Sequence, residues 1–354
     1  MKNPQKKPAS KITMSDVAAL AGVGSATVDR VLNERGNVSD DVRKRVLAAA
    51  RELGLRRILP SSHHRHVRVN VILARPERPL ITRMANEFRR QSLRLDRTIS
   101  IHRTLLKYES PEAISEAMGR GGFDAIIVDA PDHPLVHATI RELAAQGRPV
   151  VTIISDVPET ERLAYAGIDH HKAGRSAAFF MGRMTPAASR PGKVVVLCHH
   201  IGFQAHAERL RGLTDQLLAA APHLELAEIV RGGDDPHVSE TKRKDAFRRH
   251  PETTGTYNAG AGNRGVVAAM RAGILPRPPI FIGHELTAFT WASLRDGSMT
   301  LTIDQSPELQ VQHALEVLMS HFGFESAGHA EPPYVSTVPF VIYGPQNLPD
   351  QQPA

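Results

Sequence analysis

From Val67 onward, short apolar runs typical of buried strands alternate with helical stretches, and this alternation constrains the fold of most of the chain. The runs are "VRVNVILA", "ISIHRTLL", "FDAIIVDA", "PVVTIISD", "KVVVLCHH", "TGTYNA", "PIFIGHE" and "TLTID". Helical stretches of about 12–18 residues separate most of them, which is typical of parallel sheets joined by crossover helices. Eight such strands over this length predict two α/β lobes.

The first sixty residues follow a different pattern, that of three short helices. Thr13 or Ser15 can cap the first helix, and Gly22 can end it in a left-handed conformation. A second helix begins near Ser25, and a third lies in "VSDDVRKRVLAAARELG", ending at Gly54. Two short helices joined by a glycine turn, with a third packed on them, predict a helix-turn-helix over residues 12–56. An ordinary three-helix bundle is the alternative.

The second helix, "GSATVDRVLN", has an apolar face of Val28, Val31 and Leu32 and an opposite face of small and polar residues. In a helix-turn-helix the second helix enters the major groove, and its N-terminal residues meet base edges. Short side chains let the backbone come close, and alanine can touch a thymine methyl group. The predicted DNA contacts in this region are Thr13, Ser15, Ser25, Ala26, Thr27, Asp29, Arg30 and Asn33.

The distribution of charge supports a nucleic-acid partner. Residues 1–66 hold 13 Lys and Arg against 6 Asp and Glu, whereas the rest of the chain carries 31 of each. The net charge of +7 is therefore confined to the N-terminal part. Such asymmetry favours a DNA-binding module attached to a neutral domain, although a solubilising basic tail would give the same totals.

The segment from Thr13 to Leu55 resembles the headpiece of LacI/GalR-family bacterial transcription regulators. The shared pattern is D-V-A-x-x-A-G-V, then T-V-x-R-x-L-N, then V-S-x-x-x-R-x-x-V-x-x-A. Two positions depart from it. Gly24 stands where the family has a capping serine, so Ser25 is expected to cap the helix. Asp29 also replaces a serine, and we expect it to steer Arg30 or to accept from a cytosine amino group.

The resemblance implies a hinge over residues 57–66 that places a leucine in the minor groove. The usual Ala-Arg-x-Leu pattern is missing, and the chain reads "LRRILPSSHHRHVR". Leu59 is the candidate wedge, with Arg56 and Arg57 as phosphate contacts. A metal site is the alternative interpretation of the histidines in this stretch, but no cysteine or carboxylate accompanies them, so a solvated linker is favoured.

The rest of the chain is similar to the effector domain shared with periplasmic sugar-binding proteins. The matching segments are "RLAYAGIDHHKAGRSAA", "YNAGAGNRGVVAAM" and "FIGHELTAFT...DGSMTLTIDQSPELQ". The resemblance implies three crossovers between the lobes and a ligand in the cleft between them. The expected domain covers residues 67–345, with lobe 1 over 67–167 and 305–330 and lobe 2 over 168–302 and 333–345. Residues 1–11 and 346–354 are expected to be flexible.

Polar residues at the strand ends are the candidate ligand contacts, because the carboxyl ends of strands line the cleft of an open α/β sheet. Sugars are bound by carboxylates, amides and guanidiniums that pair with hydroxyl groups. The candidates are Arg75, Glu77, Asp129, Asp156, Asp169, His206, Arg209, Asn258, Glu285 and Gln305.

Two enzymatic interpretations carry less weight. "GAGNRG" matches G-x-G-x-x-G, and Glu285 lies where a ribose-binding acid is expected, so an NAD(P)-binding enzyme is an alternative. The strand before it is short and polar, which disfavours this interpretation. "CHH", ending at His200, could hold a nucleophile or a metal, but no carboxylates are evident nearby. We therefore predict no enzyme activity, no cofactor and no metal.

The sequence predicts a helix-turn-helix headpiece followed by a two-lobed, periplasmic-binding-protein-like α/β domain. One cysteine, no long apolar run and no secretory signal indicate a cytoplasmic protein with no membrane partner. The predicted function is a homodimeric transcription regulator that binds a palindromic operator. It would be controlled by a sugar, sugar acid or polyol. A solute-binding receptor without a DNA role is the alternative.

Overall fold

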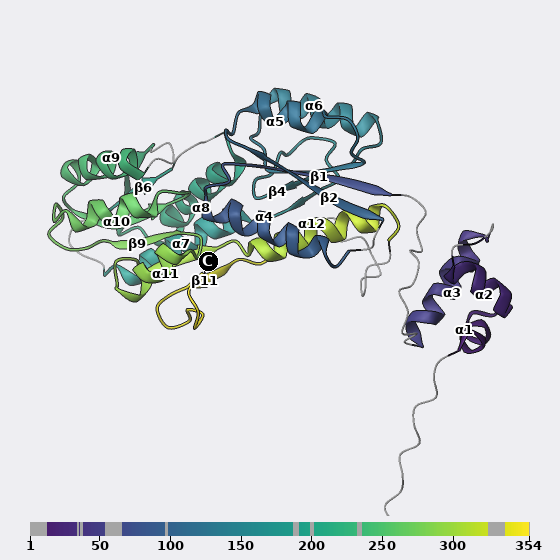
Figure 1. Cartoon of the computed structure of the whole chain (residues 1–354). Helices are drawn as coiled ribbons and strands as arrows, with labels where there is room; N and C mark the ends of the chain where they lie inside the picture. Colours follow the sequence, from purple (N-terminus) through teal and green to yellow (C-terminus); the bar gives the residue numbers. More distant parts are fainter. Residues whose placement is uncertain are drawn as a thin grey trace, which may run out of the picture. The chain divides into compact units, whose positions relative to one another are not determined.

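The computed structural model describes residues 13–33, 35, 38–53, 66–95, 98–186, 191–198, 202–231, 236–324 and 337–353. The chain divides near residue 66 into a helical N-terminal unit and a larger α/β unit, and each is described by itself (Figure 1). Within these ranges, no helix is both long enough and apolar enough to cross a membrane.

The N-terminal unit consists of helices α1 (Met14–Ala21), α2 (Ser25–Leu32) and α3 (Asp40–Glu52). Each helix contributes apolar side chains to one small core, including Val17, Val28, Leu32 and Leu47. Gly22 ends α1 at a φ of 64°, so the predicted glycine turn is confirmed. A side chain at that φ would be strained, which explains why a glycine makes this turn.

The helix caps differ in part from the expectation. Thr13, and not Ser15, caps α1, and its side chain and that of Asp16 form a reciprocal capping box. The prediction that Ser25 caps α2 is wrong. Gly24 is the N-cap, with no side-chain hydrogen bond, and Ser25 is the first residue inside the helix. The hydroxyl of Ser25 is therefore not used as a cap.

The first sheet of the α/β unit has the order β2-β1-β3-β4-β5. Its strands are β1 (Val67–Ala74), β2 (Ile99–Leu106), β3 (Ala125–Val128), β4 (Val150–Ile153) and β5 (Ala164–Ala166). Helices α5 (Pro111–Gly119) and α6 (Pro134–Ala145) bury their apolar sides against one face. Helices α4 (Pro79–Ser92) and α12 (Pro307–His321) pack together and contact β1, β4 and β5.

The second sheet has the order β11-β10-β9-β8-β6-β7. Its strands are β6 (Gly192–Leu197), β7 (Leu224–Val230), β8 (Thr253–Asn258), β9 (Ile280–His284), β10 (Leu301–Asp304) and β11 (Val341–Tyr343). Its helices are α7 (His170–Met184), α8 (Gln204–Ala220), α9 (Pro236–Arg249), α10 (Asn263–Arg271) and α11 (Ala288–Arg295). The strand pairs are parallel except β10–β11, which is antiparallel.

Alternate residues of β6 show how helices cover both faces of the second sheet. Val194 and Val196 pack with residues of α7 and α8, whereas Val195 and Leu197 pack with residues of α9, α10 and α11. Because side chains alternate along a strand, these two cores lie on opposite faces. A sheet buried on both faces explains the continuous apolar runs in the sequence.

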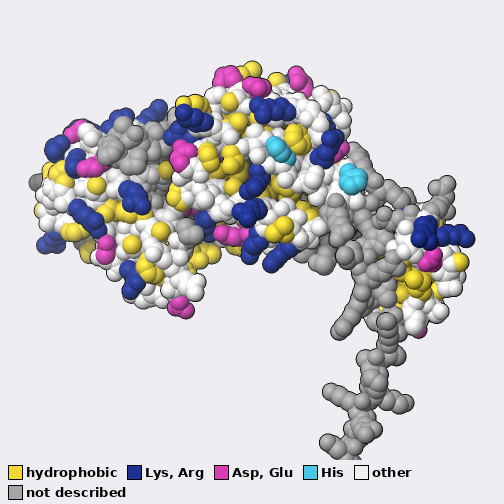
Figure 2. All heavy atoms as spheres, in the orientation of Figure 1, with side chains coloured by type: hydrophobic (Ala, Val, Ile, Leu, Met, Phe, Trp, Pro, Cys, Tyr) yellow, Lys and Arg dark blue, Asp and Glu magenta, His cyan; other side chains and the backbone are white. Residues whose placement is uncertain are grey.

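The surface of the α/β unit carries charges of both signs. On the face shown in Figure 2, Lys and Arg side chains are spread over the unit, and Asp and Glu side chains lie among them. Several of these charges form exposed pairs along one helix, such as Arg120 with Glu116 on α5 and Arg248 with Asp245 on α9. This mixture agrees with the balanced charge of residues 67–354 in the sequence.

The predicted two-lobed α/β fold is confirmed, but three of the described strands were not predicted. β5 and β11 have three residues each, and β7, "LELAEIV", lies at a sheet edge with only Leu224 and Val230 buried. The chain leaves the first sheet after β5, returns to it as α12, and rejoins the second sheet at β11. The backbone amide of Val338 donates to the Gly167 carbonyl at 2.9 Å, so two of these connections lie side by side.

The chain end differs from the expectation of a flexible tail. Trp291 Nε1 in α11 donates to the Pro349 carbonyl at 3.1 Å, and the Gln352 amide donates to the Ala288 carbonyl at 3.2 Å. Leu348 packs against the second core. The described part of this tail is therefore held against α11. The expected flexible N-terminus, residues 1–11, lies outside the described residues.

Candidate functional site

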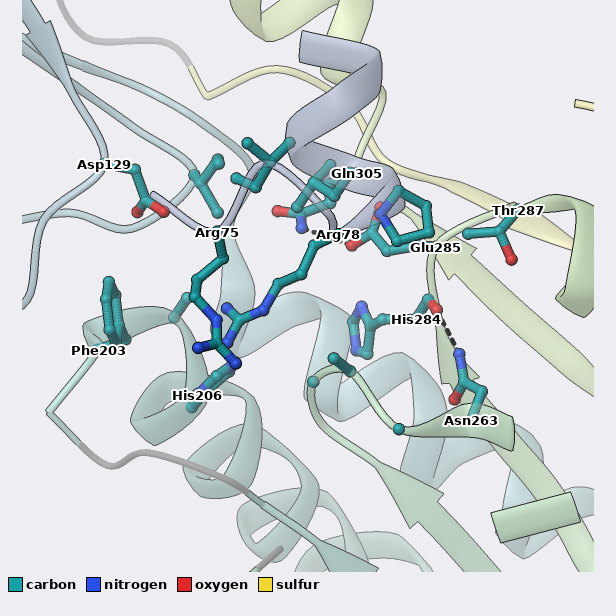
Figure 3. Close-up of a pocket in the computed structure, with 18 of the residues that line it drawn as sticks. Arg75, Arg78, Asp129, Phe203, His206, Asn263, His284, Glu285, Thr287 and Gln305 are labelled. Atoms are coloured by element: carbon teal, nitrogen blue, oxygen red, sulfur yellow. Dashed lines mark hydrogen bonds between the residues drawn. The ribbon is translucent and has the colours of Figure 1, made fainter. Parts of the chain in front are cut away.

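A cavity of about 710 Å³ lies between the two lobes, at the carboxyl ends of the strands (Figure 3). Arg75, Glu109 and Asp129 approach it from the ends of first-sheet strands, and Glu285 and Gln305 approach it from the second sheet. This volume is in the range of small-molecule pockets. The cavity lies at the strand ends, where the sequence predicts the binding cleft.

Backbone strain is concentrated at the walls of this cavity. Arg75, Ile154 and Glu285 have φ values of 60°, 66° and 71°, and each comes directly after a strand. All three residues line the cavity. A positive φ is rare outside glycine and is an outlier for a β-branched residue such as Ile154. Such strain persists only where the surrounding structure enforces it, and it clusters at functional sites.

Apart from Arg75 Nε, which forms an ion pair with Glu77, five cavity residues carry a buried polar atom that has no hydrogen-bond partner among the described residues. These atoms are Asp129 Oδ1, Arg209 Nη2, His284 Nδ1, Glu285 Oε2 and Gln305 Oε1. Leaving a buried polar group unpaired costs about 1–3 kcal/mol. Five such atoms around one cavity indicate a site built to hydrogen-bond a ligand.

Arg209 is the most buried cation of the cavity, with 2% of its surface exposed. It projects from α8, its Nε donates to His170 Nδ1 at 3.1 Å, and its Nη1 donates to the Ala259 carbonyl at 2.8 Å. Because these bonds fix the plane of the guanidinium, the two N–H groups of the free Nη2 point in fixed directions. Arg209 is therefore a preorganised donor for a ligand oxygen.

The two unpaired carboxyl groups have raised pKa values. Burial raises the pKa of Asp129 to about 8, and the neighbouring Glu109 carboxylate adds to this. Burial, followed by the charge of Asp304, raises the pKa of Glu285 to about 7, although Arg209 opposes the shift. Asp129 therefore holds a proton at neutral pH, and Glu285 is divided between its two forms.

The raised pKa of Asp129 predicts that the stability of the fold depends on pH. The folded chain holds a proton at Asp129 up to about pH 8, whereas the unfolded chain releases it near pH 3.8, the ordinary pKa of an aspartate. The contribution of the protonated Asp129 to the free energy of unfolding is thus fully present below pH 4, and it is lost as the pH rises towards 8. Asp129→Asn should raise the free energy of unfolding at pH 8 by at least about 1 kcal/mol, and by less at pH 5. Urea unfolding at both pH values measures this, with the exposed Asp350→Asn as control. An equal effect at both pH values would contradict the assignment.

The other charged residues of the cavity are already engaged. Arg75 Nε lies 3.1 Å from Glu77 Oε1, and Arg78 makes a two-pronged ion pair with Glu109. The Arg264 guanidinium lies 4.6 Å from the centre of the Phe289 ring. The ring of Phe203 adds a further apolar surface to the wall (Figure 3). The lining therefore combines apolar faces with a few convergent polar groups, as ligand sites do.

Hydrogen bonds also join the two lobes around the cavity. From α4 in the first lobe, Arg83 Nη1 donates to the Leu286 carbonyl of the second at 3.2 Å. Where α8 begins, the Ala205 amide donates to Ser155 Oγ at 3.2 Å. The lobes thus contact each other directly beside the cavity. A ligand between them can therefore change the position of one lobe relative to the other.

The structure brings most of the sequence-predicted contacts together. The cavity is lined by Arg75, Glu77, Asp129, His206, Arg209, Glu285 and Gln305. Further lining residues were not predicted, among them Arg78, Glu109, Ser155, Phe203, Asn263, Arg264, His284, Thr287 and Phe289. Glu109 and Ser155 shortly follow predicted strands, so the rule used for the other candidates could have found them.

Three predicted contacts lie outside the cavity lining. Asp156 accepts from Arg162 Nε and Nη2 at 2.5 and 2.6 Å and from the Thr152 hydroxyl. Asp169 caps α7 by accepting from the Lys172 amide at 2.8 Å. The structure therefore corrects both placements to local structural roles.

Asn258, the third of them, is buried behind the cavity wall. Its amide donates to the Ala261 carbonyl at 2.9 Å and to Asn263 Oδ1 at 2.6 Å. Asn263 in turn donates to the His284 carbonyl at 2.9 Å (Figure 3). Asn258 therefore orders the "GAGNRG" turn, in which Gly262 has a φ of 93° and caps α10. The backbone of this turn lines the cavity.

The sequence also offers Cys198 and the histidines near it, and those of the hinge, as candidates for a nucleophile or a metal site. Cys198 is buried, and the two histidines that follow it lie outside the described residues, as do His63 and His64. In the ranges that the structure describes, no group of three His, Cys, Asp or Glu residues is arranged to hold a metal ion.

The second candidate site is the outer face of α2. Ser25, Ala26 and Arg30 are exposed there, and Thr27 is half-buried. Asp29 Oδ1 accepts from Asn33 Nδ2 at 2.6 Å, so Asp29 is engaged with Asn33 and does not steer Arg30. Thr13 and Ser15 are exposed at the start of α1. The hinge candidates Arg56, Arg57 and Leu59 lie outside the described residues.

Fold and site together define a two-lobed α/β binding protein that carries a helix-turn-helix unit. Residues 109–326 match the periplasmic binding protein domain, and residues 13–57 match the bacterial regulatory proteins of the lacI family. The chain belongs to the periplasmic binding protein domain family, with a lacI-family helix-turn-helix domain at its N-terminus.

Known proteins resemble each part. The sucrose operon repressor of Klebsiella pneumoniae is 46% identical over 63 residues, which span 17% of this chain and 18% of that protein. A glucose-galactose binding protein from Geobacillus stearothermophilus has a TM-score of 0.70 at 17% identity, over 80% of this chain and 99% of its own. A solute-binding protein from Burkholderia graminis C4D1M, in complex with D-arabinose, has a TM-score of 0.70 at 18% identity, over 82% and 99%. These structures establish the fold.

Proposed function

We propose that the chain is a ligand-responsive transcription regulator, which binds operator DNA through α2 and a small effector in the cavity between its lobes. The observation that carries this proposal is the set of five unpaired polar atoms around the cavity, in a chain that begins with a lacI-family headpiece. The exposed face of Ser25, Ala26 and Arg30 supplies the DNA-reading surface.

The open groups of the cavity favour an uncharged sugar or polyol over a sugar acid. Glu285 and Gln305 each leave an oxygen free to accept, and the protonated Asp129 carboxyl can donate or accept, whereas Arg209 leaves one cationic nitrogen free to donate. A ligand with several hydroxyl groups satisfies this surplus of acceptors. A carboxylate on the ligand would lie close to Glu285 and be repelled by its ionised form. The relatives named for glucose and galactose, arabinose and sucrose are in keeping with this class.

The regulator would act as a cytoplasmic homodimer without catalytic activity. A two-fold dimer places one headpiece on each half-site of a palindromic operator. The effector contacts both lobes, so its binding changes the relative position of the lobes. That change alters the affinity of the regulator for operator DNA. This is allostery as a coupling free energy between two sites, with repression relieved by the sugar.

Two measurements on the full chain test the proposal. The first is a thermal shift with D-glucose, D-galactose, D-arabinose, D-fructose, sucrose, a sugar acid and nicotinamide cofactors, since a ligand that binds the folded state stabilises it. The second is operator binding with and without the stabilising sugar. Stabilisation by a nicotinamide cofactor alone would favour the enzyme alternative. Sugar binding without sequence-specific DNA binding would favour the receptor.

Arg30→Ala tests the proposed recognition helix. The Arg30 side chain is exposed, and Asp29 beside it is bonded to Asn33, so the guanidinium remains available to DNA. We expect operator affinity to fall by about tenfold or more, as for loss of one base or phosphate contact. Titration of operator DNA measures this, with Arg94→Ala in the α/β unit as control. Unchanged operator affinity in Arg30→Ala would show that α2 is misassigned.

A further inference from the structure

His170, the first residue of α7, lies between two cavity residues that belong to different lobes. Its Nε2 is 2.6 Å from the carbonyl oxygen of Ile154, which follows β4 of the first lobe. Its Nδ1 accepts from Arg209 Nε, on α8 of the second lobe, at 3.1 Å. Only 5% of His170 is exposed. Although its imidazole is absent from the cavity lining, it connects two residues that form that lining.

The two hydrogen bonds fix where the proton of His170 lies. Arg209 Nε can only donate, so Nδ1 must be unprotonated. A neutral ring then carries its proton on Nε2, where it can donate to the Ile154 carbonyl. Burial, followed by the charge of Arg209, holds the pKa of His170 well below its usual value. One neutral tautomer therefore satisfies both partners.

The partner in the first lobe is itself held in a strained position. Ile154 has a φ of 66°, and its carbonyl also accepts from the Tyr165 hydroxyl of β5 at 3.0 Å. Its amide donates to Gln310 Oε1 of α12 at 3.1 Å, and Gln310 Nε2 donates to the Gln305 carbonyl at 2.9 Å. Groups from β5, α7 and α12, which flank the connections between the lobes, thus converge on Ile154.

We propose that His170 is a positioning residue that links Arg209 of the second lobe to Ile154 of the first through hydrogen bonds. It thereby couples ligand binding in the cavity to the relative position of the two lobes. The inference rests on the proposed function. A ligand oxygen that accepts a hydrogen bond from Arg209 Nη2 displaces the guanidinium, whose Nε donates to His170. The imidazole passes that displacement to the strained carbonyl at the lobe boundary.

The test compares His170→Leu with His170→Gln in the full chain, and uses His171→Leu as the matched control. Leucine removes both hydrogen bonds, whereas the glutamine amide can still accept from Arg209 and donate to Ile154. His171 is the next residue of α7, and it bonds instead to Asp215. The probes are D-glucose, D-galactose, D-arabinose, D-fructose and sucrose. The readouts are the affinity for whichever of these binds the wild type, and the ratio of operator affinities without and with it.

We expect His170→Leu to lower both the sugar affinity and the operator ratio about tenfold, with Gln restoring each to within about threefold of wild type. Equal behaviour of His170→Leu and His171→Leu would overturn the inference. So would a glutamine variant as impaired as the leucine variant, because that pattern indicates packing alone.

A measurement without sugar separates this inference from the proposed function. In nitrogen-15 spectra of the full chain at pH 7, His170 should be protonated at Nε2 and unprotonated at Nδ1. If no sugar binds the wild type, the proposed function fails, while this spectrum still tests the hydrogen bonds of His170 to Arg209 and Ile154. A doubly protonated ring, or a proton on Nδ1, would rule out the bond from Arg209 and with it the inference.

Discussion

Replacing Arg209 by methionine is expected to lower the sugar affinity of the chain by at least about a hundredfold. Hydrogen bonds to a charged group contribute about 1.5–3 kcal/mol, and this change removes three donors at once. The ligand oxygen, His170 Nδ1 and the Ala259 carbonyl would each lose a partner inside a closed site. Calorimetric titration with the panel sugar that stabilises the wild type measures this loss.

Arg211→Met is the matched control for this prediction, since it removes an arginine of the same helix that is exposed and bonded to Glu208. The Arg209 variant should still bind operator DNA, because the headpiece folds around its own apolar core. Its operator binding should no longer respond to the sugar. If Arg209→Met responds to the sugar at the wild-type concentration, then Arg209 does not bind the effector. The cavity assignment would then have to be revised even though the fold stands.

Most of the strands that could be predicted are buried on both faces, although the edge strand β2, in which only Ile99 is buried, was predicted as well. β1, β3, β4 and β6 consist almost entirely of buried apolar residues, so their sequences differ sharply from the helices around them. β7 lies at an edge and carries two glutamates, Glu225 and Glu228, and β5 and β11 are too short to form a pattern. Their strand character comes from pairing with a neighbour, which only the assembled sheet supplies.

The position of a polar residue at a strand end predicts the cavity, but it does not distinguish a ligand contact from a local structural role. Asp129 and Asp156 both follow first-lobe strands, yet Asp129 keeps an unpaired oxygen, whereas Asp156 is bonded to Arg162. The difference depends on an arginine six residues further along, placed by a turn that has no signature in the sequence. Partners of this kind decide which charged groups remain available to a ligand.

His170 illustrates a second limit of prediction from the sequence. As one of two adjacent histidines at the start of a helix, it has no feature that separates it from His171. Helical geometry turns His171 towards Asp215 and His170 towards the lobe boundary. Its role depends on Ile154 and Arg209, which lie far away in the chain and meet only when both lobes are assembled.

Gly212→Ala is expected to destabilise the α/β unit by about 2–3 kcal/mol, because it overpacks the closest contact between α7 and α8. A Cβ at Gly212 would lie 2.0 Å from the His171 carbonyl oxygen, and one at Gly174 would lie 2.0 Å from the Arg209 carbonyl oxygen. Backbone atoms meet the new group on both sides of this contact, so the helices must separate.

That separation should also impair the site, because α7 begins with His170 and α8 carries Arg209 one turn before Gly212. Urea unfolding measures the loss of stability, and titration with the binding sugar measures the loss of affinity. Gly119→Ala is the control, since a Cβ there meets nothing within 4 Å. Alanine at that position should leave stability unchanged or raise it slightly. If both variants unfold at the same urea concentration as the wild type, the two helices are not in the close contact from which the position of Arg209 follows.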